Sequence, residues 1–114
     1  MRFELEVISE ELLPAIRSLL ARELSESYGM KQAEIARKLE LTQPAVSNYL
    51  NGERSDEDIK EKISDDPQIQ ILIEDAAGHA AKDQDYSEEI SQIIWNVRDK
   101  GLIKERFSEA SKIL

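Results

Sequence analysis

The chain has 114 residues, a net charge of −9, six aromatic residues and no cysteine. This length corresponds to one domain with a modest, mostly aliphatic core. The charge excludes a generally basic coat protein of nucleic acid, and the lack of cysteine excludes disulfides and thiolate metal sites. No signal-peptide core or membrane span is visible, so we expect an intracellular, cytoplasmic protein.

The negative charge is unevenly distributed along the chain. Residues 1–54 hold seven Lys and Arg against nine Asp and Glu, whereas residues 55–114 hold eight against fifteen. Residues 31–54 hold four basic residues against three acidic ones, so this segment has a net charge of +1. An acidic remainder would repel phosphate and confine contact with nucleic acid to one face. The alternative is that the acidic surface serves only solubility.

Residues 3–8, FELEVI, alternate between apolar and acidic side chains, which is typical of a strand. No second strand is apparent in the sequence, and a lone strand leaves its backbone groups unpaired. We expect either pairing with the same strand of a second copy across a two-fold axis or an extended arm packed on helices.

The next element is a helix over residues 9–28 with a broad apolar stripe (Leu12, Leu13, Ile16, Leu19, Leu20 and Leu24). Because Pro14 cannot lie deep in a helix, we expect the main helix to begin at Leu13 or Pro14 and to end at Gly29. This helix should back the pair of helices that follows. We expect Arg17 and Arg22 to be solvated.

Residues 32–52, QAEIARKLELTQPAVSNYLNG, predict two short helices joined by a tight turn. The buried faces are Ile35, Ala36 and Leu39 in the first helix and Val46, Tyr49 and Leu50 in the second. Thr42 is a good N-cap for the second helix, Pro44 suits its first turn, and Asn51-Gly52 ends it. The outward face of the second helix carries short neutral side chains (Gln43, Ser47, Asn48 and Asn51). These suit hydrogen bonds to base edges better than they suit an ordinary solvated helix.

Three or four further helices are predicted after this pair. Ser55 is the expected N-cap of a fourth helix ending near Ser64, and Asp66-Pro67 should begin a helix over residues 67–82. Ser87 is the expected N-cap of a helix that ends at Gly101, and residues 102–114 favour one more. The single histidine, His79, has no acidic or cysteine neighbour at metal-ligand spacing, so we expect it to be structural or exposed.

The spacing of residues 32–49 resembles the helix-turn-helix of the Cro and lambda-repressor type, often called the XRE family. The matching positions are Gln32, Ala36, Leu41, Val46 and Tyr49. Glu40 departs from the family pattern, because glycine is usual there and a non-glycine residue in a left-handed turn costs about 1 kcal/mol. We therefore expect a turn of different shape, with Glu40 directed away from phosphate.

A wider resemblance covers residues 11–54, through the segment LLARELSESYGMKQAEIARKLELTQPAVSNYLNGER. This segment is similar to predicted archaeal transcriptional regulators, including the DNA-binding domains of archaeal thiamine-biosynthesis regulators. The resemblance weakens through the C-terminal half and implies no catalytic domain. It does imply that Gln32 contacts backbone phosphate and braces Gln43.

Together these features predict an all-α protein, with a lambda-repressor-like helix-turn-helix unit in residues 1–64 and a helical extension in residues 65–114. We expect sequence-specific binding of double-stranded DNA without a cofactor or metal, and a homodimer held by the extension. The candidate DNA-binding residues are Gln32, Thr42, Gln43, Pro44, Ser47, Asn48, Asn51 and Arg54.

Two other interpretations stay open. The hairpin of helices could be purely structural, and the chain could be an antitoxin-like or adaptor module that binds a basic protein partner through its acidic surface. An enzyme is not expected, because a single histidine, no cysteine and no glycine-rich phosphate loop leave few of the usual catalytic groups.

Overall fold

The computed structural model describes residues 3–108, and the elements in this range are all helical. In chain order they are α1 (Glu4–Val7), a π-helical stretch (Ile8–Leu12), α2 (Leu13–Tyr28), α3 (Gln32–Leu39), α4 (Gln43–Leu50), α5 (Glu57–Ser64), α6 (Pro67–Ala81), α7 (Ser87–Asp99) and α8 (Lys104–Phe107). The all-α prediction is confirmed. The main N-terminal helix begins at Leu13, as Pro14 indicated.

The predicted N-terminal strand is wrong, because its residues form α1 and lead without a break into α2. The Phe3 amide donates to Glu6 Oε1 at 3.1 Å, which caps the helix start. Phe3 and Leu5 are 45% and 60% exposed, whereas Val7 is fully buried. The alternating pattern therefore does not mark one buried face. Both the pairing of two strands and the extended arm are excluded.

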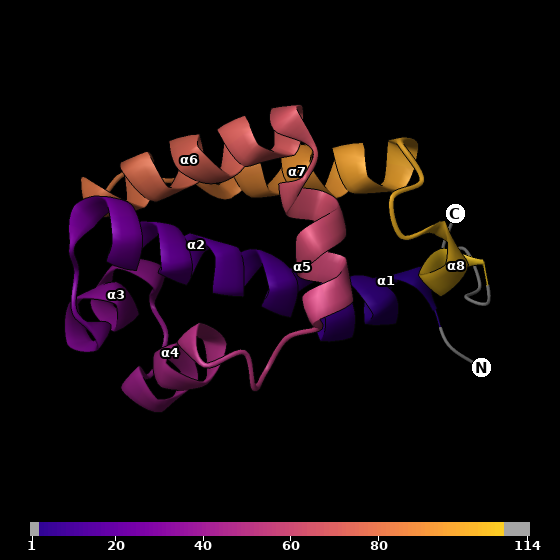
Figure 1. The fold of residues 1–114 in the computed structure, drawn as a ribbon. Coiled ribbons are helices and arrows are strands. Elements are labelled where there is room, and N and C mark those ends of the chain that lie inside the picture. Colours follow the sequence, from indigo (N-terminus) through magenta and orange to yellow (C-terminus); the bar gives the residue numbers. More distant parts are fainter. Residues whose placement is uncertain (1–2, 109–114) are drawn as a thin grey trace.

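Helix α2 is the central element of the fold. In Figure 1 it runs through the middle of the molecule, with α6 and α7 on one side and α3 and α4 on the other. The predicted apolar stripe of residues 9–28 belongs to the hydrophobic core of the protein. Its buried members are Leu12, Ile16, Leu19, Leu20 and Leu24, and Leu13 is partly buried. On α6 the buried alanines Ala76, Ala77 and Ala80 let the two long helices approach closely.

Several predicted helix ends are confirmed and two are shifted by a residue. Asp66 accepts a hydrogen bond from the Ile69 amide at 3.0 Å and caps α6, as expected. The N-cap of α5 is Asp56 rather than Ser55, and its carboxylate accepts from the Asp58 amide at 2.9 Å. Ser87 is the first residue of α7 rather than its cap, since the side chain of Asp85 accepts from both the amide and the hydroxyl of Ser87. At α5 the neighbouring Asp56 supplies the capping oxygen, whereas the N-cap of α7 is Tyr86, which makes no side-chain cap bond.

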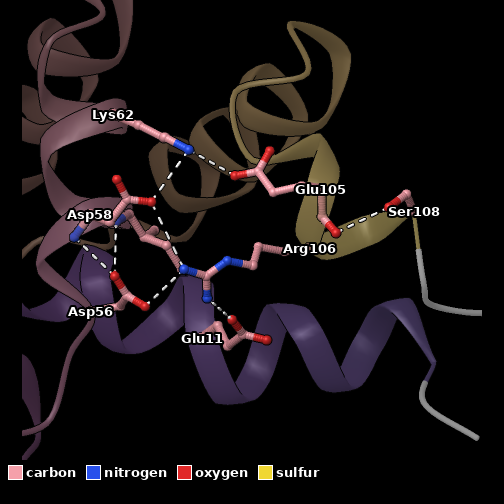
Figure 2. A network of polar contacts seen from close by, with 8 residues as sticks. Glu11, Asp56, Asp58, Lys62, Glu105, Arg106 and Ser108 are labelled. Atoms are coloured by element: carbon pink, nitrogen blue, oxygen red, sulfur yellow. Dashed lines mark hydrogen bonds and ion pairs between the residues drawn. The ribbon is translucent and has the colours of Figure 1, made fainter.

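The last described helix, α8, is held by ion pairs rather than by a long apolar face (Figure 2). The Arg106 guanidinium pairs with Glu11, and at 3.0 Å with Asp56. Lys62 on α5 pairs with Glu105 at 2.7 Å. The predicted helix over residues 102–114 is seen only as this one turn, and its expected positions Ala110 and Leu114 lie outside the described residues.

Within residues 3–108, no helix is both long enough and apolar enough to cross a membrane.

Candidate nucleic-acid interface

Helices α3 and α4 form the predicted hairpin and pack against α2 through a shared apolar core. Ile35, Leu39, Val46 and Tyr49 are 0–6% exposed. Ala36 of α3 is 7% exposed, so a larger side chain there would have to displace the elements packed against α3. The prediction that residues 9–28 back this pair of helices is confirmed.

The turn after α3 keeps its left-handed shape although Glu40 replaces the usual glycine. Glu40 has φ 55° and ψ 44°, and the Leu41 amide donates to the Ala36 carbonyl at 2.9 Å. This hydrogen bond is the pattern that glycine normally closes at the end of a helix. The expectation of a differently shaped turn is therefore wrong. Glu40 accepts the strained conformation, which costs about 1 kcal/mol.

The start and end of α4 follow the sequence signals. Thr42 Oγ1 accepts a hydrogen bond from the Ala45 amide at 3.2 Å, and Pro44 lies in the first turn of α4. Asn51 ends the helix, followed by Gly52 at φ 75°. Both ends of α4 are thus fixed by local interactions, so its outward side chains have a defined orientation.

The outward side of α4 is a rim of uncharged polar side chains, as predicted. Gln43, Pro44 and Asn51 are exposed, while Ser47 and Asn48 are half-buried. Within the described residues, the side chains of Gln43, Ser47, Asn48 and Asn51 make no hydrogen bond to the protein. Their donors and acceptors are available to a ligand. Hereafter we call residues 43, 47, 48 and 51 the polar rim, which Pro44 adjoins.

Three other candidate residues, Gln32, Thr42 and Arg54, lie outside the rim in the sequence. Gln32 begins α3, is half-buried, and is not hydrogen-bonded to Gln43. Thr42 is exposed just before the rim. Arg54 follows the rim, where its guanidinium lies 5.3 Å from the centroid of the Tyr49 ring. A cation held over an aromatic face has fewer conformations to lose when it binds an anion.

A buried polar network that the sequence analysis missed anchors the inner side of α4. Ser18 Oγ on α2 donates to the Tyr49 carbonyl at 2.9 Å and accepts from Lys60 Nζ at 3.2 Å. Lys60 on α5 also pairs with Glu57 at 2.6 Å, although the Lys60 side chain is only 5% exposed. The signal available in the sequence was Ser18, a polar residue within the leucine stripe of α2. This network joins α2, α4 and α5 at the end of the rim helix.

The basic residues near the rim are fewer than the sequence count suggests. Lys38 pairs with Asp83 at 3.0 Å, and its side chain is only 8% exposed. Lys31, Arg37 and Arg54 are exposed, and Arg37 lies 4.0 Å from Glu34 in a contact weakened by solvent. Three exposed cations therefore remain around the hairpin to meet phosphate.

Asp56, which follows the hairpin and caps α5, is held by hydrogen bonds and by an ion pair with Arg106. Burial raises the pKa of Asp56, but hydrogen bonds from the Ile59 amide and from Arg106 outweigh burial and leave the pKa below its ordinary value. Asp56 therefore stays ionised as it caps α5.

His79 lies elsewhere, on α6, with Nδ1 2.7 Å from Glu89. Among residues 3–108, no group of His, Asp or Glu side chains is arranged to hold a metal ion.

Comparison with known proteins agrees with this geometry. A helix-turn-helix family model matches residues 21–61, a range that runs from the second half of α2 into α5. No curated protein and no solved structure gives a significant match. Residues 21–61 thus match a helix-turn-helix of the Cro/C1 type, which is a class of DNA-binding segment.

Proposed function

We propose that this protein is a sequence-specific regulator of transcription that places α4 in the major groove of double-stranded DNA. The observation that carries the proposal is the polar rim, which is directed outward from the hairpin and whose side chains make no hydrogen bond to any of residues 3–108. The major groove admits one α-helix and displays a distinct donor and acceptor pattern for each base pair. Figure 1 supports access, because α6 and α7 lie on the other side of α2 from α4.

The candidate residues divide into two roles in this proposal. Gln43, at the first position of α4, reads a base, with Ser47 and Asn48 next along the helix and with Pro44 and Asn51 completing the surface. Gln32, Thr42 and Arg54 contact phosphate, which positions the protein without carrying sequence information. Charge supports the division, because the rim itself is uncharged and Arg54 lies beyond its end.

We further propose that residues 1–64 bind DNA and that residues 65–114 hold two copies together. Trp95 on α7 is 63% exposed and Ile71 on α6 is 59% exposed, and burial of these large apolar side chains against a second copy would favour association. A homodimer would set two α4 helices about 34–36 Å apart on a palindromic site. Sedimentation at micromolar concentration checks this assembly, and a purely monomeric species would contradict it. The likeness to archaeal thiamine regulators stays a prediction.

Selection of bound sequences from a random duplex pool, combined with a salt titration on random duplex, tests the function. We expect an enriched palindromic motif and an affinity that falls steeply as salt rises, since phosphate contacts release counterions. The competing function is an antitoxin-like or adaptor module for a basic protein, which the net charge of −9 favours. That module would enrich no motif and show no salt-dependent DNA binding.

A further inference from the structure

Two adjoining cavities lie between the turn of the helix-turn-helix and the hairpin that joins α6 to α7. The inner cavity has a volume of about 280 Å³ and the outer one about 640 Å³. Glu40, Tyr86 and Ile90 line both of them. Volumes of about 300–1,000 Å³ are typical of small-molecule sites, so the pair is large enough for a metabolite.

The inner cavity has an aliphatic wall that comes from four parts of the fold. Leu13, Ile16 and Leu20 of α2 line one side, with Leu39 of α3, Leu41 of the turn and Ile90 of α7 around them. Leu13, Leu41 and Ile90 are only partly buried. A ligand with an apolar side chain would cover the surface that these three residues leave exposed.

Two opposite charges lie at the edge of this apolar wall. Arg17 and Glu40 both line the inner cavity, yet within the described residues neither side chain has a hydrogen bond or an ion pair. Both act on the same hydroxyl group: burial raises the pKa of Tyr86, the Glu40 carboxylate raises it further, and Arg17 opposes the rise. A cation and an anion therefore face one cavity without being joined to each other.

We propose that the inner cavity binds a small zwitterion with an apolar side chain, namely an aliphatic α-amino acid of about the size of leucine. The ligand carboxylate pairs with Arg17, its ammonium group pairs with Glu40, and its side chain lies against the leucines. A carboxylic acid without the amine would leave Glu40 beside an added negative charge. An amine without the carboxylate would leave Arg17 unpaired.

The position of the cavity gives the ligand a route to the DNA-binding helices. Glu40 and Leu41 are in the turn between α3 and α4, whereas Tyr86 and Ile90 belong to the C-terminal hairpin. A ligand bound between them contacts both the turn before α4 and the segment that joins α6 to α7. It thereby restricts the movement of α4 when the protein binds DNA. This regulatory step rests on the proposed function, but binding of the amino acid does not.

Calorimetric titration of the full chain without DNA tests the binding site directly. L-leucine should bind with a Kd of about 1 mM or tighter. Three probes, namely 4-methylpentanoate, 3-methylbutylamine and L-serine, lack respectively the ammonium group, the carboxylate and the apolar side chain. Each should bind at least about tenfold more weakly, because each leaves one part of the site without its partner.

Matched variants then assign the binding to this cavity. Arg17→Gln and Glu40→Gln should each weaken leucine binding about tenfold or more, with Arg17→Lys keeping part of the affinity. Arg22→Gln, an exposed change on the same helix, should leave it unchanged. No saturable heat with leucine, equal binding of 4-methylpentanoate, or leucine affinity unaffected by Arg17→Gln would each overturn the proposal. Unchanged circular dichroism of the variants shows that they fold.

A final titration separates this inference from the proposed function. If leucine binds and no DNA motif is enriched, the ligand site is supported and the proposed function as a regulator is contradicted. If DNA binds and leucine gives no heat, the reverse holds. If both bind, saturating leucine should change the affinity for the selected DNA site at least about threefold, and Arg17→Gln should abolish that change.

Discussion

Replacement of Ser18 by alanine tests the buried network behind α4. The hydroxyl makes two buried hydrogen bonds, to the Tyr49 carbonyl at 2.9 Å and from the Lys60 ammonium at 3.2 Å. A neutral hydrogen bond contributes about 0.5–1.5 kcal/mol and one to a charged group about 1.5–3 kcal/mol. The loss is partly offset, since the Tyr49 carbonyl also accepts from the Gly52 amide at 3.2 Å and Lys60 keeps Glu57. We expect Ser18→Ala to lower the free energy of unfolding by about 2 kcal/mol.

Urea unfolding measures this change, and a double-mutant cycle with Lys60→Met identifies its source. Because Lys60→Met removes the buried charge, the double variant should lose less stability than the sum of the single variants. Ser27→Ala is the matched control, since Ser27 is on the same helix but is exposed, and its hydroxyl donates to the carboxylate of Glu23 one turn away. A loss below about 0.5 kcal/mol for Ser18→Ala, or strict additivity in the cycle, would refute the reasoning.

Three further predictions follow from the helix ends and the ion pairs. Glu40→Gly should raise the free energy of unfolding in urea by about 1 kcal/mol, because it removes the left-handed strain, and no gain would contradict this. Asp66→Asn keeps a capping oxygen but loses the 2.9 Å ion pair with Lys100. The hydrogen bond from Lys100 lowers the pKa of Asp66 below its ordinary 3.8. The ion pair therefore stabilises the fold fully at pH values above 3.8, and this stabilisation is lost as the pH falls through the pKa of Asp66 in the folded state. Thermal melts should therefore show a gap between wild type and Asp66→Asn that closes in acid, and a gap independent of pH would contradict the sign. Arg106→Gln removes three ion pairs, with Glu11, Asp56 and Asp58. Its cost in the same melts should shrink between about 0.05 M and about 0.5 M salt, and a cost that does not respond to salt would count against these pairs.

The helix-turn-helix could be predicted from the sequence because its signals are local. Each signal lies within about one helical turn of the feature that it determines. Ile35, Ala36 and Leu39 mark the buried face of α3, Thr42 marks the start of α4, and Asn51-Gly52 marks its end. At residues 3–8 the local pattern indicates the wrong structure. The alternation of apolar and acidic residues over positions 3–7 fits a strand. The structure of this segment is instead decided by continuation into α2 and by the ion pair of Glu4 with Arg98, 3.0 Å apart.

The features that were missed depend on contacts between distant parts of the chain. Ser18 meets Tyr49 and Lys60 across 31 and 42 residues of sequence, and a serine in a leucine stripe does not name its partners. Arg17 was expected to be solvated; it is partly exposed, and it also lines a cavity together with Tyr86 and Ile90. Such pairings follow from helix packing, which the periodicity of one helix at a time does not specify.

The central claim is that Gln43 reads a base, and paired affinities on two DNA duplexes test it most directly. Gln43→Ala should lose about 1–3 kcal/mol, or roughly five- to 150-fold in affinity, on the selected site. Affinity for random duplex should hardly change. Gln92→Ala, an exposed glutamine on α7, should leave both affinities unchanged. Equal losses of Gln43→Ala on the selected and the random duplex would contradict base reading by the polar rim.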